Sequence, residues 1–176
     1  ILFVGALSSY HNDFLYKQVN SPRSYDIVLY GSGLETEKLE GKVDYKGFVS
    51  SDELIATAEG EYGLAWYGSS LEGGSGALGE YLQYNAPHKM SLYIRCGLPI
   101  IVWEKAGLAP FVKKNNVGIC ISSLTELEDI LPKISAGQYM EMKKNVLQIA
   151  DKLSHGYYCF KAIKQACADL GGEIKG

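Results

Sequence analysis

The sequence predicts an α/β fold: a Rossmann-like, doubly wound parallel sheet of about six strands, with two helices closing the chain. Short apolar runs alternate with segments of helical periodicity, which is typical of parallel strands joined by crossover helices. The run at 98–103 is apolar at almost every position, as in a strand covered on both faces. With 176 residues, 47% of them hydrophobic, the chain can form one domain with a substantial core.

The first strand is expected at 1–4, and a helix at about 12–19 follows it. The second strand, at 27–30, leads into Gly31-Ser32-Gly33. This glycine pair suggests a dinucleotide fingerprint, but Thr36 stands where the third glycine of G-x-G-x-x-G would fall. A tight turn after the strand is therefore the better interpretation.

A third strand is expected at 43–49, and Ser50 with Glu53 forms a capping box that opens a helix to about residue 58. The fourth strand is expected at 62–67. Five of the twelve residues at 68–79 are glycine, which predicts a mobile loop. Loops of this length usually either have a function or are flexible connections. Its position after a strand favours a lid, because ligands of open α/β sheets bind at the carboxyl ends of the strands.

The stretch from Tyr84 to Val102 predicts a helix start, a short helix and a buried strand. Pro87 suits the first helical turn and Gly97 the left-handed position after the helix. His88 and Lys89 lie in the first turn, where the helix dipole disfavours cations, so an anion such as phosphate is expected there. The alternative is a surface lysine whose stem packs on its neighbours, and the residues leave both interpretations open.

After this strand the pattern predicts a helix at 108–115, a sixth strand at 117–121, and a second capping box, Ser123 with Glu126, opening a helix to 131. Apolar residues then recur at intervals of three and four, which predicts two amphipathic helices packed on the sheet rather than a partner surface. These stripes are Tyr139, Met142, Val146, Ile149 and Leu153, then Phe160, Ile163, Cys167 and Leu170.

Composition excludes several classes of protein. A net charge of −3 and a pI near 5.6 argue against a nucleic-acid partner. The sequence shows neither a transmembrane run nor a signal peptide. Four dispersed cysteines without a C-x-x-C pair favour a reducing, cytoplasmic location. The chain begins inside an apolar run, so an excerpt from a longer protein is expected.

The central stretch resembles the carboxy-terminal domain of GT-B glycosyltransferases. More narrowly, it is similar to bacterial glucosyltransferases that extend O-glycans on serine-rich adhesins and to related galactofuranosyltransferases. The resemblance covers essentially the whole of residues 1–176. The residues that carry it are Tyr84, Asn85, Pro87, His88, Lys89, Tyr93 and Gly97, the run 99–106, Val117-Gly118-Ile119 and Ser122-Ser123-Leu124.

The resemblance implies that this chain binds the nucleotide-sugar donor, while an absent amino-terminal half binds the glycan or glycoprotein acceptor. The implied reaction transfers a hexose, with glucose the first expectation, from a UDP-sugar. Lys89 would stabilise the leaving UDP. For three of the implied residues a structural role is an equally good interpretation: Phe48 and Tyr67 as core aromatics, and Gly5 as a turn glycine. The implied donor-binding residues are Gly5, Ala6, Leu7, Ser8, Phe48, Val49, Tyr67, Gly68, Asn85, His88 and Lys89.

The sequence also departs from the family pattern. Many retaining GT-B enzymes carry two glutamates seven residues apart around this helix, but Leu92 stands where the second would fall. The family's recognition of sugar hydroxyl groups by that glutamate pair therefore cannot be transferred to this chain. The sequence also leaves open the catalytic residues and whether the reaction retains or inverts the configuration of the sugar. Metal and cofactors are not expected, because the three histidines are not spaced as ligands and GT-B enzymes manage the diphosphate without Mg²⁺. Two interpretations of Glu72, Glu80 and Glu104 are equally good: that they act at the site, or that they are solvent-exposed surface residues.

Two other functions remain open. A GT-B sugar-nucleotide epimerase would use the same fold but needs acid and base residues from both halves. A non-catalytic homologue would bind a nucleotide or a partner enzyme. Homo-oligomerisation is also left open.

Overall fold

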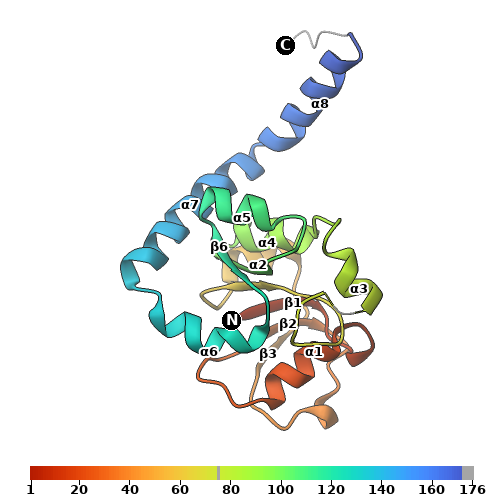
Figure 1. Ribbon diagram of the computed structural model, residues 1–176, viewed down its shortest axis with the longest axis vertical. Coiled ribbons are helices and arrows are strands. Elements are labelled where there is room, and N and C mark those ends of the chain that lie inside the picture. The colour runs from red at the N-terminus through yellow and green to blue at the C-terminus, as the bar shows by residue number, and fades with distance from the viewer. Residues whose placement is uncertain (75, 172–176) are drawn as a thin grey trace.

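The computed structural model describes residues 1–74 and 76–171 (Figure 1). One six-stranded parallel sheet forms its centre, with strand order β3-β2-β1-β4-β5-β6. The strands are β1 (Leu2–Ala6), β2 (Val28–Ser32), β3 (Asp44–Gly47), β4 (Gly63–Ala65), β5 (Ile100–Trp103) and β6 (Gly118–Ile121). All six predicted strands are therefore confirmed, with ends displaced by a few residues at most.

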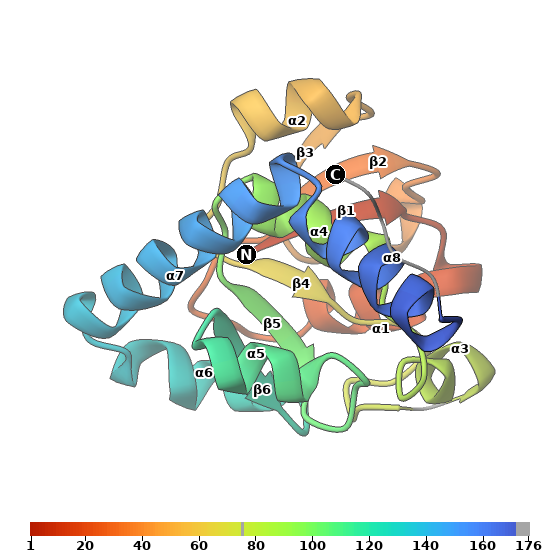
Figure 2. The ribbon, with the colours of Figure 1, turned by 90° about the horizontal axis from the view of Figure 1, so that it is seen from above.

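The helices cover both faces of the sheet, so the predicted doubly wound α/β fold is confirmed (Figures 1 and 2). They are α1 (Ser9–Asn20), α2 (Ser51–Thr57), α3 (Gly76–Tyr81), α4 (His88–Arg95), α5 (Ala109–Asn115), α6 (Leu127–Ile130), α7 (Ala136–Ser154) and α8 (Tyr157–Asp169). Three short 3₁₀ turns complete the list: η1 (Thr36–Lys38), η2 (Leu124–Glu126) and η3 (Leu131–Lys133).

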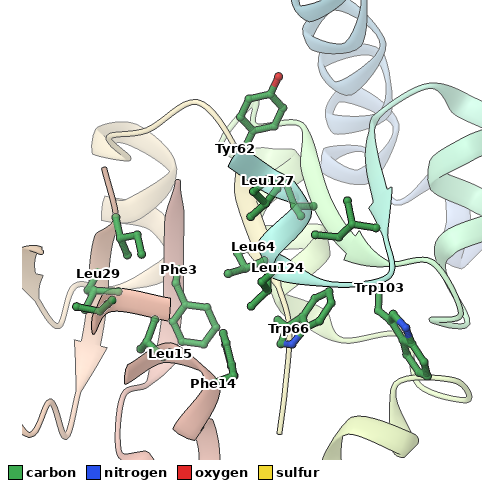
Figure 3. Packing of buried hydrophobic residues seen from close by; sticks show 14 of the residues in the cluster. Phe3, Phe14, Leu15, Leu29, Tyr62, Leu64, Trp66, Trp103, Leu124 and Leu127 are labelled. Carbon is green, nitrogen blue, oxygen red and sulfur yellow. The ribbon is translucent and has the colours of Figure 1, made fainter. Parts of the chain in front are cut away.

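Alternating side chains of each strand serve two separate cores. Along β5, Ile101 and Trp103 join the core under α1 and α6, whereas Ile100 and Val102 join the core under α4, α5 and α7. In the first core the rings of Phe3 and Phe14 meet edge to face, with centroids 5.6 Å apart (Figure 3). The central strands are thus buried on both sides, as their unbroken apolar sequence predicts.

The strand order reverses between β1 and β4, which pair directly only at Leu2 and Gly63. The fully buried Tyr93 of α4 bridges the gap beyond that pair: its hydroxyl accepts a hydrogen bond from the Val4 N–H and donates one to the Leu64 carbonyl, both at 3.0 Å. A side chain on Gly63 would collide with the Tyr93 ring, since an added Cβ would lie 2.3 Å from its Cγ. Such a reversal point is where open α/β sheets bind ligands.

Two predicted helix starts have different outcomes. The Ser50 side chain accepts a hydrogen bond from the Glu53 N–H at 3.2 Å and begins α2 as expected. The Ser123 side chain instead accepts from the Thr125 N–H, so the second capping box is wrong. The expected helix to 131 is divided into η2, α6 and η3. Pro132 explains why α6 does not continue past Ile130, because a proline cannot continue a regular helix.

The glycine-rich stretch at 68–79 is partly fastened to the sheet. The Gly73 N–H donates to the Ser122 carbonyl and the Leu124 N–H to the Leu71 carbonyl, both at 2.9 Å. A Cβ on Gly73 would lie 2.0 Å from the Trp103 ring, so only glycine allows this close packing. Ser75 lies outside the described residues, and movement of this stretch over a ligand stays a prediction.

The two closing helices differ. In α7 the side chains of Met142, Val146 and Ile149 are buried, which confirms core packing of the first stripe. Over Tyr157–Asp169 no residue is buried, and α8 extends away from the sheet (Figure 1). The predicted packing of its stripe on the sheet is therefore wrong, because a sequence pattern cannot tell whether a surface lies within reach.

Candidate functional site

A cavity of about 600 Å³ lies at the carboxyl ends of β1 and β2, beside the first turns of α1, α2 and α4. It borders the reversal point between β1 and β4, since Tyr67, which follows β4, is part of its lining. This position agrees with the expected ligand site. It is lined by Val4, Gly5, Ala6, His11, Asn12, Tyr30, Gly31, Ser32, Phe48, Val49, Ser51, Leu54, Tyr67, His88, Lys89 and Leu92.

A larger hollow, of about 810 Å³, lies around Ile1, Asp26 and Tyr62 near the amino ends of the strands. Volume alone would favour it. We favour the carboxyl-end cavity, because parallel strands of open α/β sheets present their ligands at that end.

Lys89 is the electrostatic centre of the cavity, although it is only 6% exposed. Its Nζ lies 4.3 Å from the centroid of the Phe3 ring and 4.2 Å from that of the Tyr67 ring, so the amine is held between two aromatic rings. In the described part of the chain it forms no ion pair with a carboxylate. Burial lowers the pKa of Lys89 from its usual 10.5 to about 7, because a charged amine loses its hydration there.

The first turn of α4 supplies further donors beside this amine. Pro87 precedes the helix, and its side chain provides no cap. The Met90 N–H donates to the Pro87 carbonyl at 3.0 Å, so among the described residues only the N–H groups of His88 and Lys89 stay open in this turn. The predicted left-handed glycine after the helix end is confirmed, since Gly97 has φ +72°. Pro87 was expected in the first helical turn but lies one residue before it, with an extended backbone (ψ 128°). Open N–H groups, a helix dipole and an amine at one point are the features of an anion site.

Two glycines allow the backbone to form the floor of the cavity. Gly5 and Gly31 are paired residues of β1 and β2, with φ of +136° and +142°. A Cβ on Gly31 would lie 1.8 Å from the Gly5 carbonyl oxygen. Gly31 therefore belongs to a strand at the site, and its interpretation as part of a tight turn after the strand is wrong.

Phe48 and Val49 follow β3 and also line the cavity. Phe48 is 77% exposed, so it is not a core aromatic. An exposed ring at the mouth of a cavity can stack on a planar ligand. Tyr67 is half-buried and places its ring against the Lys89 amine.

Four of the predicted donor-binding residues do not line this cavity: Leu7, Ser8, Gly68 and Asn85. Leu7 is fully buried, and its carbonyl accepts a hydrogen bond from the Tyr16 hydroxyl at 2.6 Å. The Gly68 carbonyl accepts from the Phe14 N–H at 3.3 Å, which ties β4 to α1. The Asn85 N–H donates to the Tyr81 carbonyl at 3.0 Å. The other seven, including Ala6 and His88, do line it.

The sequence interpretation missed two polar residues of α1, His11 and Asn12, which line the cavity opposite α4. Their position three and four residues after Ser8 was the available signal, because the first turn of a helix after a parallel strand begins at the carboxyl edge. The lining thus includes three basic side chains, His11, His88 and Lys89, and no aspartate or glutamate.

Within residues 1–74 and 76–171, no three histidine, cysteine or acidic side chains gather as metal ligands would. None of the helices described there is long and apolar enough to cross a membrane.

Two solved structures share the fold. WaaG, a glycosyltransferase involved in lipopolysaccharide biosynthesis, superposes with a TM-score of 0.56 at 18% identity, over 85% of this chain and 42% of that one. Anabaena Alr3699/HepE, solved in complex with UDP-glucose, superposes with a TM-score of 0.54 at 17% identity, over 86% of this chain and 44% of that one. These similarities confirm the fold of the GT-B carboxy-terminal half.

Two curated proteins are related in sequence. The chain is 32% identical over 173 residues to the Beta-1,6-galactofuranosyltransferase WbbI of Escherichia coli (strain K12), covering 97% of this chain and 50% of that protein. It is 28% identical over 137 residues to Glucosyltransferase 3 of Streptococcus gordonii, covering 77% of this chain and 40% of that protein. The chain thus spans about half the length, or less, of these relatives. The family model described as "Glucosyltransferase 3-like, C-terminal domain" matches residues 1–166, and the chain therefore belongs to this family of glycosyltransferases as its C-terminal domain.

Proposed function

We propose that this chain binds the UDP-sugar donor of a hexosyltransferase, with glucose the first candidate for the transferred sugar. The acceptor, a glycan or glycoprotein, would be held by an amino-terminal half outside residues 1–176. One observation carries the proposal: the buried Lys89 amine faces a cavity and has no acidic partner in the described chain.

Buried charges in proteins are normally paired, because an isolated ion in an apolar environment is costly. The Phe3 and Tyr67 rings compensate the Lys89 ammonium only in part. A diphosphate would supply the missing negative charge, and the open N–H groups of α4 would bind its oxygens.

The rest of the cavity fits the other parts of a nucleotide. Phe48 and Val49 lie at the β3 side, where an exposed ring and an apolar side chain suit a pyrimidine base. The glycine pair of β1 and β2 allows the ligand to approach the backbone closely between base and diphosphate. A volume of about 600 Å³ lies in the usual range for small-molecule sites.

The related proteins support this choice of ligand. HepE, which shares the fold, was solved with UDP-glucose. WbbI and Glucosyltransferase 3 are named as a galactofuranosyl- and a glucosyltransferase. In such a transfer the bond between the sugar and UDP breaks and negative charge develops on the departing diphosphate. Lys89 would stabilise that charge most strongly as it forms, which is how a binding group accelerates a reaction.

Titration calorimetry of UDP and of uridine tests the proposal on the wild type and on Lys89→Met. Methionine fills the buried space without the charge. A charge-assisted contact is worth about 1.5 to 3 kcal/mol, so we expect UDP affinity to fall about tenfold to a hundredfold. Uridine lacks phosphate groups and should bind both proteins equally. Lys161→Met, on the exposed face of α8, is the matched control and should change neither affinity.

Absence of UDP binding by the folded wild type at millimolar concentration would contradict the proposal. So would an equal loss of UDP and uridine in Lys89→Met, which indicates a collapsed pocket. Incubating the full-length protein with UDP-glucose and an acceptor then separates the three activities: glycosyl transfer, isomerisation of the sugar nucleotide, or binding alone.

A further inference from the structure

The ring of Tyr67 forms one side of the space in which the Lys89 amine lies. Tyr67 follows the end of β4 by two residues and Lys89 is the second residue of α4, and both line the cavity. The Nζ atom lies 4.2 Å from the centroid of the Tyr67 ring. This is well inside the distance of about 6 Å at which the negative face of an aromatic ring attracts a cation. The contact therefore joins two elements that meet at the reversal point of the sheet.

A lysine at a helix start does not need to turn inward. Its four-carbon stem is flexible and normally carries the ammonium group into water, and the helix dipole disfavours a cation at this end. The Lys89 amine nevertheless lies against the backbone of β1 at the cavity, since a Cβ added to Gly5 would lie 3.6 Å from Nζ. Because no carboxylate in the described part of the chain pairs with this amine, the aromatic rings are the groups that attract it there.

The two rings beside the amine differ in their other contacts. Phe3 is fully buried within β1, and its ring meets that of Phe14 edge to face, so it belongs to the core whether or not a charge lies beside it. Tyr67 is half-buried and lines the cavity. Tyr67 is therefore the ring whose effect on the amine can be tested without removing a fully buried core residue.

We propose that Tyr67 is a positioning residue of the diphosphate site, whose ring face holds the Lys89 amine beside Gly5 and favours its charged form. The inference rests on the proposed function of the cavity, and it assigns to Tyr67 an action through Lys89 rather than a contact with the base or the sugar. Burial lowers the pKa of Lys89 to about 7, so near neutral pH even a moderate attraction to the ring changes the charged fraction. Since a diphosphate binds the charged form, Tyr67 determines how much of the protein is ready to bind above pH 7.

Three variants separate the ring face of Tyr67 from its hydroxyl group and from the fold. Tyr67→Phe keeps the ring face, and Tyr67→Leu removes it. Tyr62→Leu is the matched control, because Tyr62 lies directly before β4 and does not line this cavity. Its ring packs on that of Tyr139 instead, with centroids 5.4 Å apart. Both leucine variants remove an aromatic ring beside β4, but only Tyr67→Leu removes one from the Lys89 amine.

Titration calorimetry of the full-length protein with UDP at pH 6 and at pH 8.5 measures the effect. We expect Tyr67→Leu to weaken UDP binding about tenfold at pH 8.5 but at most about twofold at pH 6, where Lys89 is charged without the ring. Tyr67→Phe and Tyr62→Leu should bind UDP as the wild type does at both pH values. Three other titratable side chains line the cavity: His11, Tyr30 and His88. The ratio of variant to wild-type affinity cancels their titration and that of UDP.

A double-mutant cycle shows whether Tyr67 acts through Lys89. Adding Tyr67→Leu to Lys89→Met should leave the UDP affinity of Lys89→Met unchanged, because no amine remains to be held. A further loss of about tenfold in the double variant would mean that Tyr67 contacts the ligand directly, and it would overturn the inference. So would a loss in Tyr67→Phe as large as that in Tyr67→Leu, or a loss in Tyr67→Leu that is equal at both pH values.

If Tyr67→Leu does not fold, phenylalanines that carry one, two or three ring fluorines at position 67 take its place. Fluorine weakens the negative face of the ring with little change in its shape. The affinity for UDP at pH 8.5 should fall stepwise along this series, and equal affinities overturn the inference.

Failure of the wild type to bind UDP at all would contradict the proposed function, and a measurement without ligand then decides the inference. NMR titration of the Lys89 side chain in the free protein should give a midpoint about one pH unit lower in Tyr67→Leu than in the wild type. An equal midpoint overturns the inference, because the ring would then have no effect on the charge of the amine.

Discussion

Helices α4 and α8 have similar amphipathic sequences but opposite surroundings. Over its eight residues α4 buries four, including Tyr93, Ile94 and the charged Lys89. Over its thirteen residues α8 buries none, and Phe160 and Ile163 are 57% and 52% exposed. One helix thus encloses a basic side chain that has no acidic partner among the described residues. The other, which extends away from the sheet (Figure 1), leaves apolar side chains in solvent. Figure 2 shows both helices from above.

This difference teaches that a hydrophobic stripe predicts a helix but not its degree of burial. Apolar side chains contribute to stability in proportion to the area that they remove from water. The same substitution made in α4 and in α8 should therefore have different effects, and pairs of identical substitutions test the comparison directly.

The largest difference is expected for isoleucine. Ile94→Ala in α4 should lower the free energy of unfolding by about 2 to 5 kcal/mol, because it leaves a cavity beside β5. Ile163→Ala in α8 should change it by about 0.5 kcal/mol or less. Urea denaturation of both variants measures the two values. Equal losses would show that α8 is packed as well as α4.

Lys89 should make stability depend on pH. Its pKa is lowered to about 7 in the folded protein, so between pH 7 and its unfolded value the unfolded chain binds more protons. The free energy of unfolding should therefore rise with pH in this window, by about 2 kcal/mol from pH 7 to pH 9. The quantity to measure is the difference between wild type and Lys89→Met, which cancels the contributions of cysteines and tyrosines. Lys161→Met should retain the wild-type profile, and a flat difference would contradict the lowered pKa.

Lys89 should also take up a proton when the ligand binds. A diphosphate would restore the charge of Lys89, so UDP should bind with uptake of about one proton at pH 8 and much less at pH 6. Calorimetry in two buffers of different ionisation enthalpy measures this uptake. Its persistence in Lys89→Met would assign the proton to a group other than Lys89.

Removal of one tyrosine hydroxyl should also affect stability differently in α4 and in α8. Tyr93→Phe leaves the Val4 N–H and the Leu64 carbonyl without their partner in the core, which should cost about 1 to 3 kcal/mol. Tyr157→Phe in α8, at a side chain that is 46% exposed, should be nearly neutral. Thermal unfolding compares the two variants. A neutral Tyr93→Phe would show that β1 and β4 do not need this bridge.

The smallest expected effect concerns metal ions. Because Lys89 and the N–H groups of α4 can balance the diphosphate, adding EDTA should leave UDP affinity unchanged. Titration with and without the chelator checks this, and a loss of affinity restored by Mg²⁺ would contradict it.

The sequence by itself determined the order of strands and helices, because apolar periodicity and turn residues act over a few neighbouring positions. Gly97 follows the end of α4 as predicted, Pro87 lies one residue before the expected first turn, and Lys89 could be placed at a helix start beside a buried strand. The family resemblance added the expectation of a nucleotide-sugar site, and seven of the eleven residues expected there line the cavity.

Only the tertiary structure decided which residues meet. Gly31, Asn12 and Lys89 come from three separate elements, and parallel pairing of the strands brings them to one cavity. Likewise, the two rings around the Lys89 amine come from different strands, Phe3 from within β1 and Tyr67 from the segment after β4. The exposure of α8 depends on where the chain leads after Gly156. These contacts join residues far apart in the chain, so their energies depend on packing in three dimensions, which local sequence patterns do not contain.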